Sequence, residues 1–239
     1  MSLTYLYKLA TFILYKGGLS MFDGYKLIEV DGGDLSGHRE PNVVVDIGFG
    51  DREYWAFTNG YGQLVKVIAK EIILQDDSKE PVNSNGRYYN DEAKVHGAEN
   101  SDLDEGHVIA DSLGGVSNAY NITPQNSMLN RYGDQAYMEK VIRDAGGCTD
   151  FVAIITYPNT TTQIPSHYSY TYTINGNVVN DEFRNINPNE DINDLFVYWT
   201  INGKSYHTTR NCPTLSRSKN ILGGITQESE NRKICCRCK

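Results

Sequence analysis

The chain has 239 residues, of which 39% are hydrophobic and 22% are charged, a composition typical of a soluble globular protein and unlike that of a disordered or fibrous one. This length allows one domain of ordinary size together with a small second one. The 17 Tyr and 22 Gly, with repeated runs of Val, Ile, Thr and Tyr, favour strands and loops over a helical bundle. We therefore expect an α+β fold.

The charge is distributed unevenly along the chain, whose formal net charge is −8. Residues 196–239 contain eight Lys and Arg against two Glu and carry +6, so the remainder, with 14 basic and 28 acidic residues, carries −14. Such a difference favours two modules with separate roles, and the basic module is the better candidate for a phosphate-binding surface. A solvated basic tail is the alternative interpretation.

The N-terminal segment resembles neither a membrane span nor a good signal peptide. The apolar run at 9–15 is flanked by lysines, is too short to cross a bilayer and precedes no small-residue cleavage site. The tripeptide Lys-Gly-Gly at 16–18 can be encoded by a bacterial ribosome-binding sequence, and Met21 follows at the spacing of a start codon. We expect residues 1–20 to be a non-native or disordered leader.

Short strands broken by Gly-Gly, Ser-Gly and Asn-Gly turns are expected over residues 21–74, and the clearest lie at 42–47 and 64–68. The segment 75–104 is polar and rich in Gly and Asn. It predicts a long connecting loop that carries the chain into the active site.

One helix is predicted over 135–145, because Asp134 is a typical N-cap and Gly146-Gly147 would end the helix. Its apolar residues, Met138, Ile142 and Ala145, share one face at helical spacing.

Two further strands, 151–157 and 168–174, lead to a hairpin turn at Asn175-Gly176-Asn177. The Asn-, Asp- and Pro-rich stretch that follows reads as a linker at 186–195. We therefore expect a main domain over 21–185 and a C-terminal module over 196–239.

The stretch that carries chemistry runs from 104 to 131. It reads D-E-G-H-V-I-A-D-S-L-G-G at 104–115, N-I-T-P-Q at 121–125 and N-S-M-L-N-R at 126–131. Phosphodiester hydrolysis needs a base that activates water and a cation that neutralises the growing charge on the phosphate. A histidine on a strand, facing an amide ligand on the following helical segment, can supply both.

These motifs resemble the DNA/RNA non-specific endonuclease family, whose pattern is D-R-G-H, then N-x-x-P-Q-x-x-x-L-N, then a helix with a Glu. The resemblance covers roughly residues 45 to 185 and implies a ββα-metal (His-Me finger) core on an antiparallel sheet. The matching positions are Asp104, Gly106, His107, Asn121, Pro124, Gln125, Leu129, Asn130 and Glu139.

The resemblance implies a role for each matching residue. His107 would be the general base, held through its second ring nitrogen. Asn130 would be the single direct protein ligand of Mg²⁺ (or Mn²⁺), and Glu139 would accept hydrogen bonds from the metal-bound waters. Asn121 and Gln125 would brace the site and touch substrate.

In the same scheme Asp104 would fix the strand that enters the site. Glu105 departs from the family pattern, because it stands where the family often has Arg, and a carboxylate there would repel phosphate. Either it points away and Arg131 or Arg87 supplies the positive contact, or the enzyme is slow.

Plainer interpretations compete with these roles. Histidine after glycine, or Asn and Gln in a loop, is usually structural, although several matches in one order weaken that interpretation here. For Glu139, an ion pair with Arg143 one helical turn later explains the residue equally well.

Four of the five cysteines lie in the last 28 residues, which favours a local metal site over a dispersed disulfide framework. His207, Cys212, Cys235 and Cys238 form a one-His, three-Cys set that is typical of a closed structural Zn²⁺ site, with Cys236 as a spare thiol. A disulfide pair in an exported protein is the alternative.

The sequence thus predicts a metal-dependent endonuclease that acts on DNA, RNA or both with little sequence preference, with a small β-rich zinc module. A catalytically inactive nucleic-acid-binding member, or a surface interaction protein with a zinc module, is the alternative. The pattern D-x-G-H-x-I-A-D with Gly-Gly resembles a branch of this family that includes bacterial toxin domains. The localisation stays open, and an exported or surface-delivered bacterial protein is favoured over a resident cytoplasmic one, with a cognate inhibitor expected if the protein is a toxin.

Overall fold

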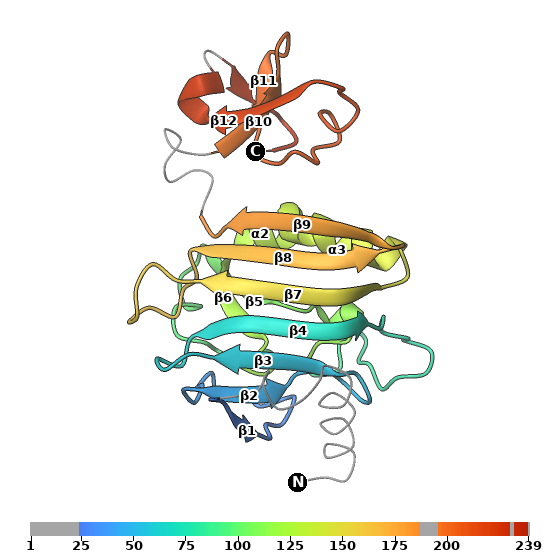
Figure 1. The fold of residues 1–239 in the computed structure, drawn as a ribbon, viewed down its shortest axis with the longest axis vertical. Helices are drawn as coiled ribbons and strands as arrows, with labels where there is room; N and C mark the ends of the chain where they lie inside the picture. The colour runs from blue at the N-terminus through green and yellow to red at the C-terminus, as the bar shows by residue number, and fades with distance from the viewer. Residues whose placement is uncertain (1–23, 187–195, 230–231, 239) are drawn as a thin grey trace. The chain divides into compact units, whose positions relative to one another are not determined.

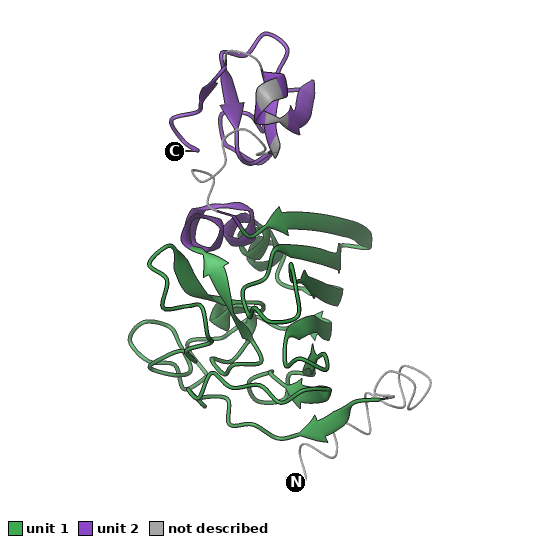
Figure 2. Ribbon diagram, turned by 90° about the vertical axis from the view of Figure 1, so that its left-hand side faces the viewer, with its two compact units in different colours: residues 1–126, 138–185 green, residues 127–137, 186–239 purple. Residues whose placement is uncertain are grey.

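The computed structural model describes residues 24–186, 196–229 and 232–238 (Figure 1). The leader expected at 1–20 and nearly all of the linker expected at 186–195 lie outside these ranges. The chain divides into two compact units, residues 1–126 with 138–185 (unit 1) and residues 127–137 with 186–239 (unit 2) (Figure 2). The domain boundaries expected from the sequence remain a prediction.

A seven-stranded sheet dominates unit 1, in the order β1-β2-β3-β4-β7-β8-β9. Every neighbouring pair is antiparallel except β1 and β2, which are parallel. The α+β fold with an antiparallel sheet is confirmed. The strands are β1 (Lys26–Ile28), β2 (Val43–Asp46), β3 (Tyr54–Thr58), β4 (Leu64–Ile72), β7 (Cys148–Thr156), β8 (His167–Ile174) and β9 (Asn177–Arg184).

One face of this sheet carries a row of buried aromatic rings. Tyr168, Tyr170 and Tyr172 alternate with less buried residues along β8, as expected for a strand with a period of two. The ring of Tyr170 lies 5.8 Å from that of Phe151 on β7 and 5.4 Å from that of Phe183 on β9. Burial of such large side chains is the main stabilising contribution of this face.

A second layer lies against this face, formed by the hairpin β5 (Leu103–His107) and β6 (Ile122–Asn126) and the 3-10 helix η2 (Asp111–Leu113) (Figures 1 and 2). Hydrogen bonds join the layers. The hydroxyls of Thr123 on β6 and Tyr168 on β8 are 2.9 Å apart, and the Tyr54 hydroxyl donates to the carbonyl of Leu113 at 2.8 Å. Because these polar groups are buried, their pairing fixes the position of the hairpin on the sheet.

The loop between β4 and β5 contains no assigned helix or strand, as predicted, yet its start is firmly held. Arg52 is almost fully buried and donates to both carboxylate oxygens of Glu80, at 2.8 and 3.3 Å, and to the carbonyls of Phe49, Ile73 and Leu74. Tyr88 donates to the same carboxylate at 2.6 Å. The two hydrogen bonds between guanidinium and carboxylate neutralise the buried charge of Arg52, and they anchor the loop to the sheet.

Helix α3 (Asp134–Asp144) follows α2 (Ser127–Tyr132) after a single residue. Met138 and Ile142 are buried, as predicted, but Ala145 is exposed because it lies beyond the last helical residue. The two glycines that follow have positive φ angles, 82° at Gly146 and 121° at Gly147. Gly147 N–H donates to the Ile142 carbonyl, so the predicted glycine stop is confirmed.

The hairpin predicted from Asn-Gly is also present, as a two-residue turn between β8 and β9. Asn175 and Gly176 both have positive φ, 50° and 78°, the combination that a type I′ turn requires.

The C-terminal part of unit 2 is a small four-stranded sheet in the order β12-β10-β11-β13. Its strands are β10 (Phe196–Thr200), β11 (Ser205–His207), β12 (Ile221–Ile225) and β13 (Lys233–Ile234), with the 3-10 helix η3 (Thr226–Ser229). Val197, Trp199 and Tyr206 form its small apolar core. Across the described ranges of the chain, no helix is long and apolar enough to cross a membrane.

Candidate active site and metal centre

The motif-bearing segment folds in the order strand, strand, helix. In the antiparallel pair β5–β6, Gly106 lies opposite Thr123 and His107 lies opposite Ile122. Helix α2 begins directly after β6, and Asn130 lies in it as a partly buried residue. His107 therefore ends the first strand of the hairpin, and Asn130 belongs to the helix that follows the second.

The two faces of the hairpin separate the motif residues into two groups. Side chains alternate along a strand, so Glu105 and His107 share one face, while Asp104 and its opposite neighbour Gln125 share the other. Thr123 is on this second face and contacts Tyr168, so Asp104 and Gln125 lie on the side of the large sheet. Gln125 is buried, which favours a bracing role over contact with substrate.

The lack of a side chain at Gly106 has a steric explanation. A Cβ at this position would approach the side-chain oxygen of Gln125 to 2.3 Å. The glycine immediately before His107 therefore makes room for Gln125 to pack against the strand.

Asn121 braces the turn that follows His107. Its side chain is fully buried, accepts a hydrogen bond from Ile109 N–H at 3.0 Å, and donates to the carbonyls of Ile109 and Val116 at 2.8 Å each. Its backbone carbonyl accepts from Val108 N–H. Both polar ends of the amide are thereby used to hold the backbone just beyond the histidine.

We expect Asn121→Ala to lower the stability of the protein by about 2 kcal/mol, because it leaves buried backbone groups without partners. In a protein of this size that corresponds to a fall in Tm of roughly 4–8 °C. Calorimetry checks this, with Asn180→Ala as the matched control because Asn180 is exposed on β9. A Tm equal to that of the control would show that the amide does not hold the turn.

His107 is surrounded by charged groups from the turn after β5 and from the preceding loop. Its Nε2 lies 3.6 Å from Oδ1 of Asp111. The Arg87 guanidinium pairs with Glu92 at 2.7 Å and lies 3.8 Å from the other oxygen of Asp111. Ligand-type atoms of Glu92, His107 and Asp111 all lie within 4.8 Å of one another. The four side chains form one connected cluster.

Burial sets the protonation of this cluster. It lowers the pKa of His107 to about 4, the negative charge of Glu92 opposing this shift and the positive charge of Arg87 adding to it. Burial likewise raises the pKa of Asp111 to about 6, while Arg87 acts in the opposite direction. At pH 7 the imidazole is thus neutral, as a proton acceptor must be, and Asp111 is ionised.

The carboxylate of Glu105 lies on the same strand face as His107, but it is paired with a cation. The ammonium of Lys94 donates to it at 2.5 Å. Of the two arginines considered as phosphate contacts, Arg87 is engaged with Glu92, and Arg131 is exposed on α2. Positive charge beside the motif therefore also comes from the loop before β5, through Lys94.

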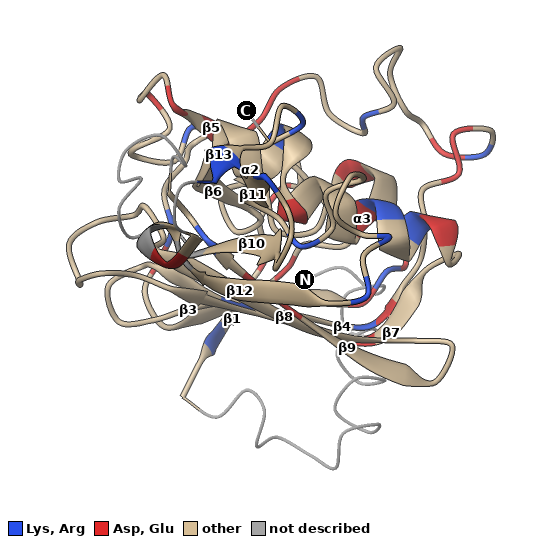
Figure 3. Ribbon diagram, turned by 90° about the horizontal axis from the view of Figure 1, so that it is seen from above, with Lys and Arg blue, Asp and Glu red and all other residues tan. Residues whose placement is uncertain are grey.

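Glu139 lies on α3, a helix that carries both acidic and basic residues (Figure 3). One of its carboxylate oxygens is 3.8 Å from Arg143, the pair expected from their helical spacing. Arg143 also donates to the hydroxyl of Ser112 at 3.1 Å. Arg143 thus links Glu139 to the residue next to Asp111.

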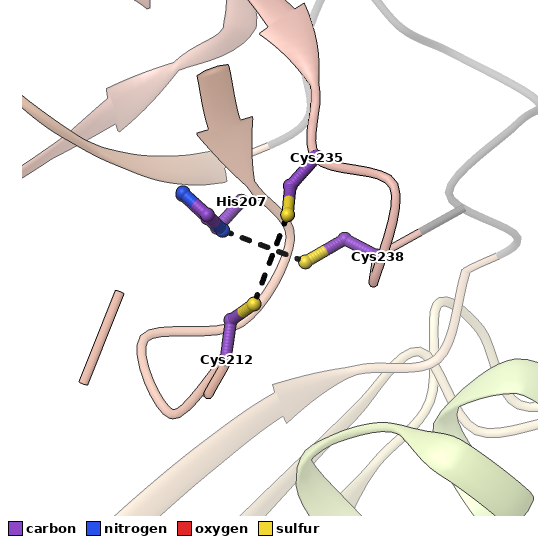
Figure 4. A group of neighbouring side chains, drawn as sticks. All are labelled: His207, Cys212, Cys235 and Cys238. Carbon is purple, nitrogen blue, oxygen red and sulfur yellow. Dashed lines mark hydrogen bonds between the residues drawn. The ribbon is translucent and has the colours of Figure 1, made fainter. Parts of the chain in front are cut away.

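The second cluster is formed by His207, Cys212, Cys235 and Cys238, which Figure 4 shows converging from three separate chain segments. The Cys212 and Cys235 sulfurs are 4.0 Å apart, and Cys238 Sγ is 3.8 Å from His207 Nδ1. A tetrahedral Zn²⁺ site has edges of about 3.5–3.8 Å, from Zn–S and Zn–N bonds of about 2.3 and 2.0 Å. The four buried donor atoms therefore fit a zinc ion.

The backbone around these cysteines turns sharply. The Cys212 carbonyl accepts from the N–H groups of Leu215 and Ser216, and the Cys235 carbonyl accepts from Cys238 N–H. All five cysteines of the chain lie in described segments, and none forms a disulfide. Cys236 is exposed, and burial raises the pKa of the isolated Cys148 to about 12. A separation of 4.0 Å is far from the 2.05 Å of a disulfide bond.

The partners of His107 were not predicted from the sequence. Asp111 could have been found from the sequence, because it stands four residues after the histidine within the same motif, and the bend at 108–109 brings it back toward the strand. No sequence pattern pointed to Glu92, since it lies in a loop whose residues show neither helical nor strand periodicity.

Comparison with known proteins gives one family. A family model described as DNA/RNA non-specific endonuclease matches residues 52–176, just over half of the chain, and includes the motif from 104 to 131. No curated protein matches the chain. Two solved structures of NucA from Streptococcus agalactiae, one with no metal bound and one with magnesium ion bound, each share 17% identity at a TM-score of 0.43. They cover 59% and 58% of this chain, and 74% and 73% of their own.

Proposed function

The chain belongs to the DNA/RNA non-specific endonuclease family, and we propose that it hydrolyses phosphodiester bonds of nucleic acid in a reaction that depends on Mg²⁺ or Mn²⁺. The proposed substrate is DNA, RNA or both, with little preference for sequence. The C-terminal module would bind Zn²⁺ as a structural ion.

The observation that carries this proposal is the position of His107. It ends the first strand of the hairpin, it is nearly buried, and burial keeps its imidazole neutral at pH 7. A neutral imidazole can accept the proton of an attacking water, which is the task of a general base in hydrolysis.

The residues around the motif also suit a hard divalent cation. Asn130 offers an amide oxygen, and Mg²⁺ prefers oxygen donors while keeping most of its waters. Bound Mg²⁺ would neutralise charge on the phosphate and on the leaving oxygen. Glu139, which lies on the helix after α2, is the proposed acceptor for the metal-bound waters.

Asn130→Ala is expected to raise the Mg²⁺ concentration needed for half-maximal activity by at least about 10-fold, since even indirect partners of a metal site contribute 10- to 100-fold. The rate at saturating Mg²⁺ should fall as well. Metal titrations of this variant, of the wild type and of Asn180→Ala measure the effect. If all three gave the same half-saturation, Asn130 would not be the ligand.

The basic module is proposed to offset the acidic charge of the rest of the chain. Its +6 becomes about +5 once three thiolates and one Zn²⁺ are included. A tethered cationic surface raises the local concentration of nucleic acid, and salt weakens this effect.

Three exposed cations of the module, Arg210, Arg217 and Lys219, allow a test that retains the fold. Replacing all three by Gln should raise KM at low salt and reduce the slope of log KM against log salt by up to about 3, about one unit for each lost phosphate contact. The Mg²⁺ requirement should stay unchanged. Lys26→Gln with Lys79→Gln, two exposed charges of unit 1, is the control.

An unchanged slope in the triple variant would mean that the module serves protein contacts or export instead. Deletion of residues 196–239 then provides an independent comparison, because the tether interpretation predicts the same flattening of the salt dependence.

The two alternatives are a catalytically inactive nucleic-acid-binding protein and a surface interaction protein with a zinc module. Incubation of the purified chain with DNA and, separately, with RNA in the presence of Mg²⁺ discriminates between them. Cleavage of either substrate supports the nuclease and identifies its preference. Binding without cleavage supports the first alternative, and neither binding nor cleavage supports the second.

A further inference from the structure

We propose that Asp111 is the positioning residue of His107: it holds the Nε2 proton of the imidazole and thereby makes Nδ1 the nitrogen that accepts a proton from water. This inference deepens the proposed function and rests on it for its catalytic consequence. The tautomer of His107, which is its structural part, does not depend on whether the chain is a nuclease.

Asp111 and His107 face each other across the bend that follows β5. The two atoms that face each other, His107 Nε2 and Asp111 Oδ1, are 3.6 Å apart, and both side chains are only 11% exposed. His107 is fixed by its place in β5, and Asp111 by η2, whose backbone bond from Gly114 N–H to the Asp111 carbonyl is 2.7 Å long. At 3.6 Å the two atoms face each other without forming a hydrogen bond, and a shift of a few tenths of an ångström would close it, as catalytic hydrogen bonds often tighten when substrate binds.

The charges around His107 favour a proton on Nε2. The groups that face the imidazole are Asp111, Glu92 and Arg87. Arg87 lies against both carboxylates and favours the ionised form of Asp111, so this carboxylate is an acceptor at pH 7. A neutral imidazole beside an ionised carboxylate places its proton on the nitrogen that faces it.

The negative charge of Asp111 also suits the proton transfer itself. When His107 takes a proton from water at Nδ1, it becomes an imidazolium with a proton on each nitrogen. The negative charge of Asp111 then lies next to a new positive charge in a buried site, where their attraction is stronger than in water. The carboxylate orients the ring before the transfer and stabilises it afterwards, as the corresponding carboxylate does in catalytic triads.

The test uses the full-length chain with ¹⁵N-labelled histidine, without metal or nucleic acid. The signal of His107 among the five histidines is identified by its loss in His107→Ala. In the wild type at pH 7 we expect the proton on Nε2. In Asp111→Asn the amide can donate to Nε2, so we expect the proton to move to Nδ1.

The same variant gives the kinetic readout. We expect kcat to fall about 10- to 100-fold, the range typical for loss of a residue that orients a functional histidine, with little change in KM. The acidic limb of the pH profile should move to lower pH, because an imidazolium without its anion is less stable. Asp150→Asn, which removes an exposed carboxylate at a positive φ that Asn tolerates, should match the wild type.

A wild-type His107 protonated on Nδ1, or an unchanged tautomer in a folded Asp111→Asn protein, would overturn the proposal. So would an unchanged kcat and pH profile in an active enzyme. If the wild type cleaves no nucleic acid, the proposed function fails while the tautomer still decides whether Asp111 holds the ring.

Discussion

Replacement of His107 by Ala is expected to lower the rate of hydrolysis by about 10²- to 10⁴-fold, the usual contribution of a general base. The change removes a proton acceptor and no proposed metal ligand. Binding of nucleic acid and the Mg²⁺ dependence of the residual activity should therefore stay close to wild type. Single-turnover rates and equilibrium binding, measured on the same preparation, separate the two effects.

His96→Ala is the matched control, because that side chain is 84% exposed and lies in the loop before β5. His107→Asn, which retains hydrogen bonding but accepts no proton at neutral pH, should behave like the alanine variant. Since the His107 side chain is only 11% exposed, its replacement can also lower stability. The Tm of each variant must therefore be measured, and rates are compared only between folded proteins. Activity near wild type in folded His107→Ala would contradict the assignment of the base.

Loss of one ligand in the second cluster is expected to unfold the C-terminal module. Structural zinc sites contribute apparent binding free energies of about 10–16 kcal/mol, and a module this small has little core to stay folded without the ion. The apolar core around Trp199 is correspondingly small. Cys212→Ser should therefore abolish stoichiometric zinc binding and expose Trp199 to water.

The chain itself provides a matched control in Cys236→Ser. Cys236 is exposed and lies outside the four-residue cluster, so this variant should retain one Zn²⁺ per chain and the wild-type fluorescence. Mass spectrometric metal analysis and tryptophan emission provide the two measurements. Equal zinc content in the Cys212 and Cys236 variants would mean that the cluster does not hold the ion.

Local patterns predicted much of the fold, because neighbouring residues determine those features. The alternation of β8, the Asn175-Gly176 turn and the Gly146-Gly147 stop each depend on residues within one or two positions. The parallel pairing of β1 with β2 could not be predicted in this way. The anchoring of the long loop by Arg52 and Glu80 could not be predicted either. The strand pairing and this anchor both arise from contacts between distant parts of the chain.

In the candidate site, too, some features follow from local sequence patterns and others from contacts between distant residues. Motif spacing predicted roles for His107, Asn121 and Asn130, which stay predictions, while the positions of their neighbours depend on which strand face they occupy. Strand alternation alone could have shown that Asp104 lies on the face opposite His107. The contacts of Arg87 with Glu92 and Asp111 had no comparable signal, because a loop of irregular backbone brings them together.

We propose above all that this chain cuts nucleic acid with His107 as its base and a divalent cation as its partner. The most direct measurement follows supercoiled plasmid incubated with the wild type and with His107→Ala, each in Mg²⁺ and in excess EDTA. We predict nicking and linearisation by the wild type in Mg²⁺ alone. Cleavage that persists in EDTA, or that is equal in folded His107→Ala, would contradict the account.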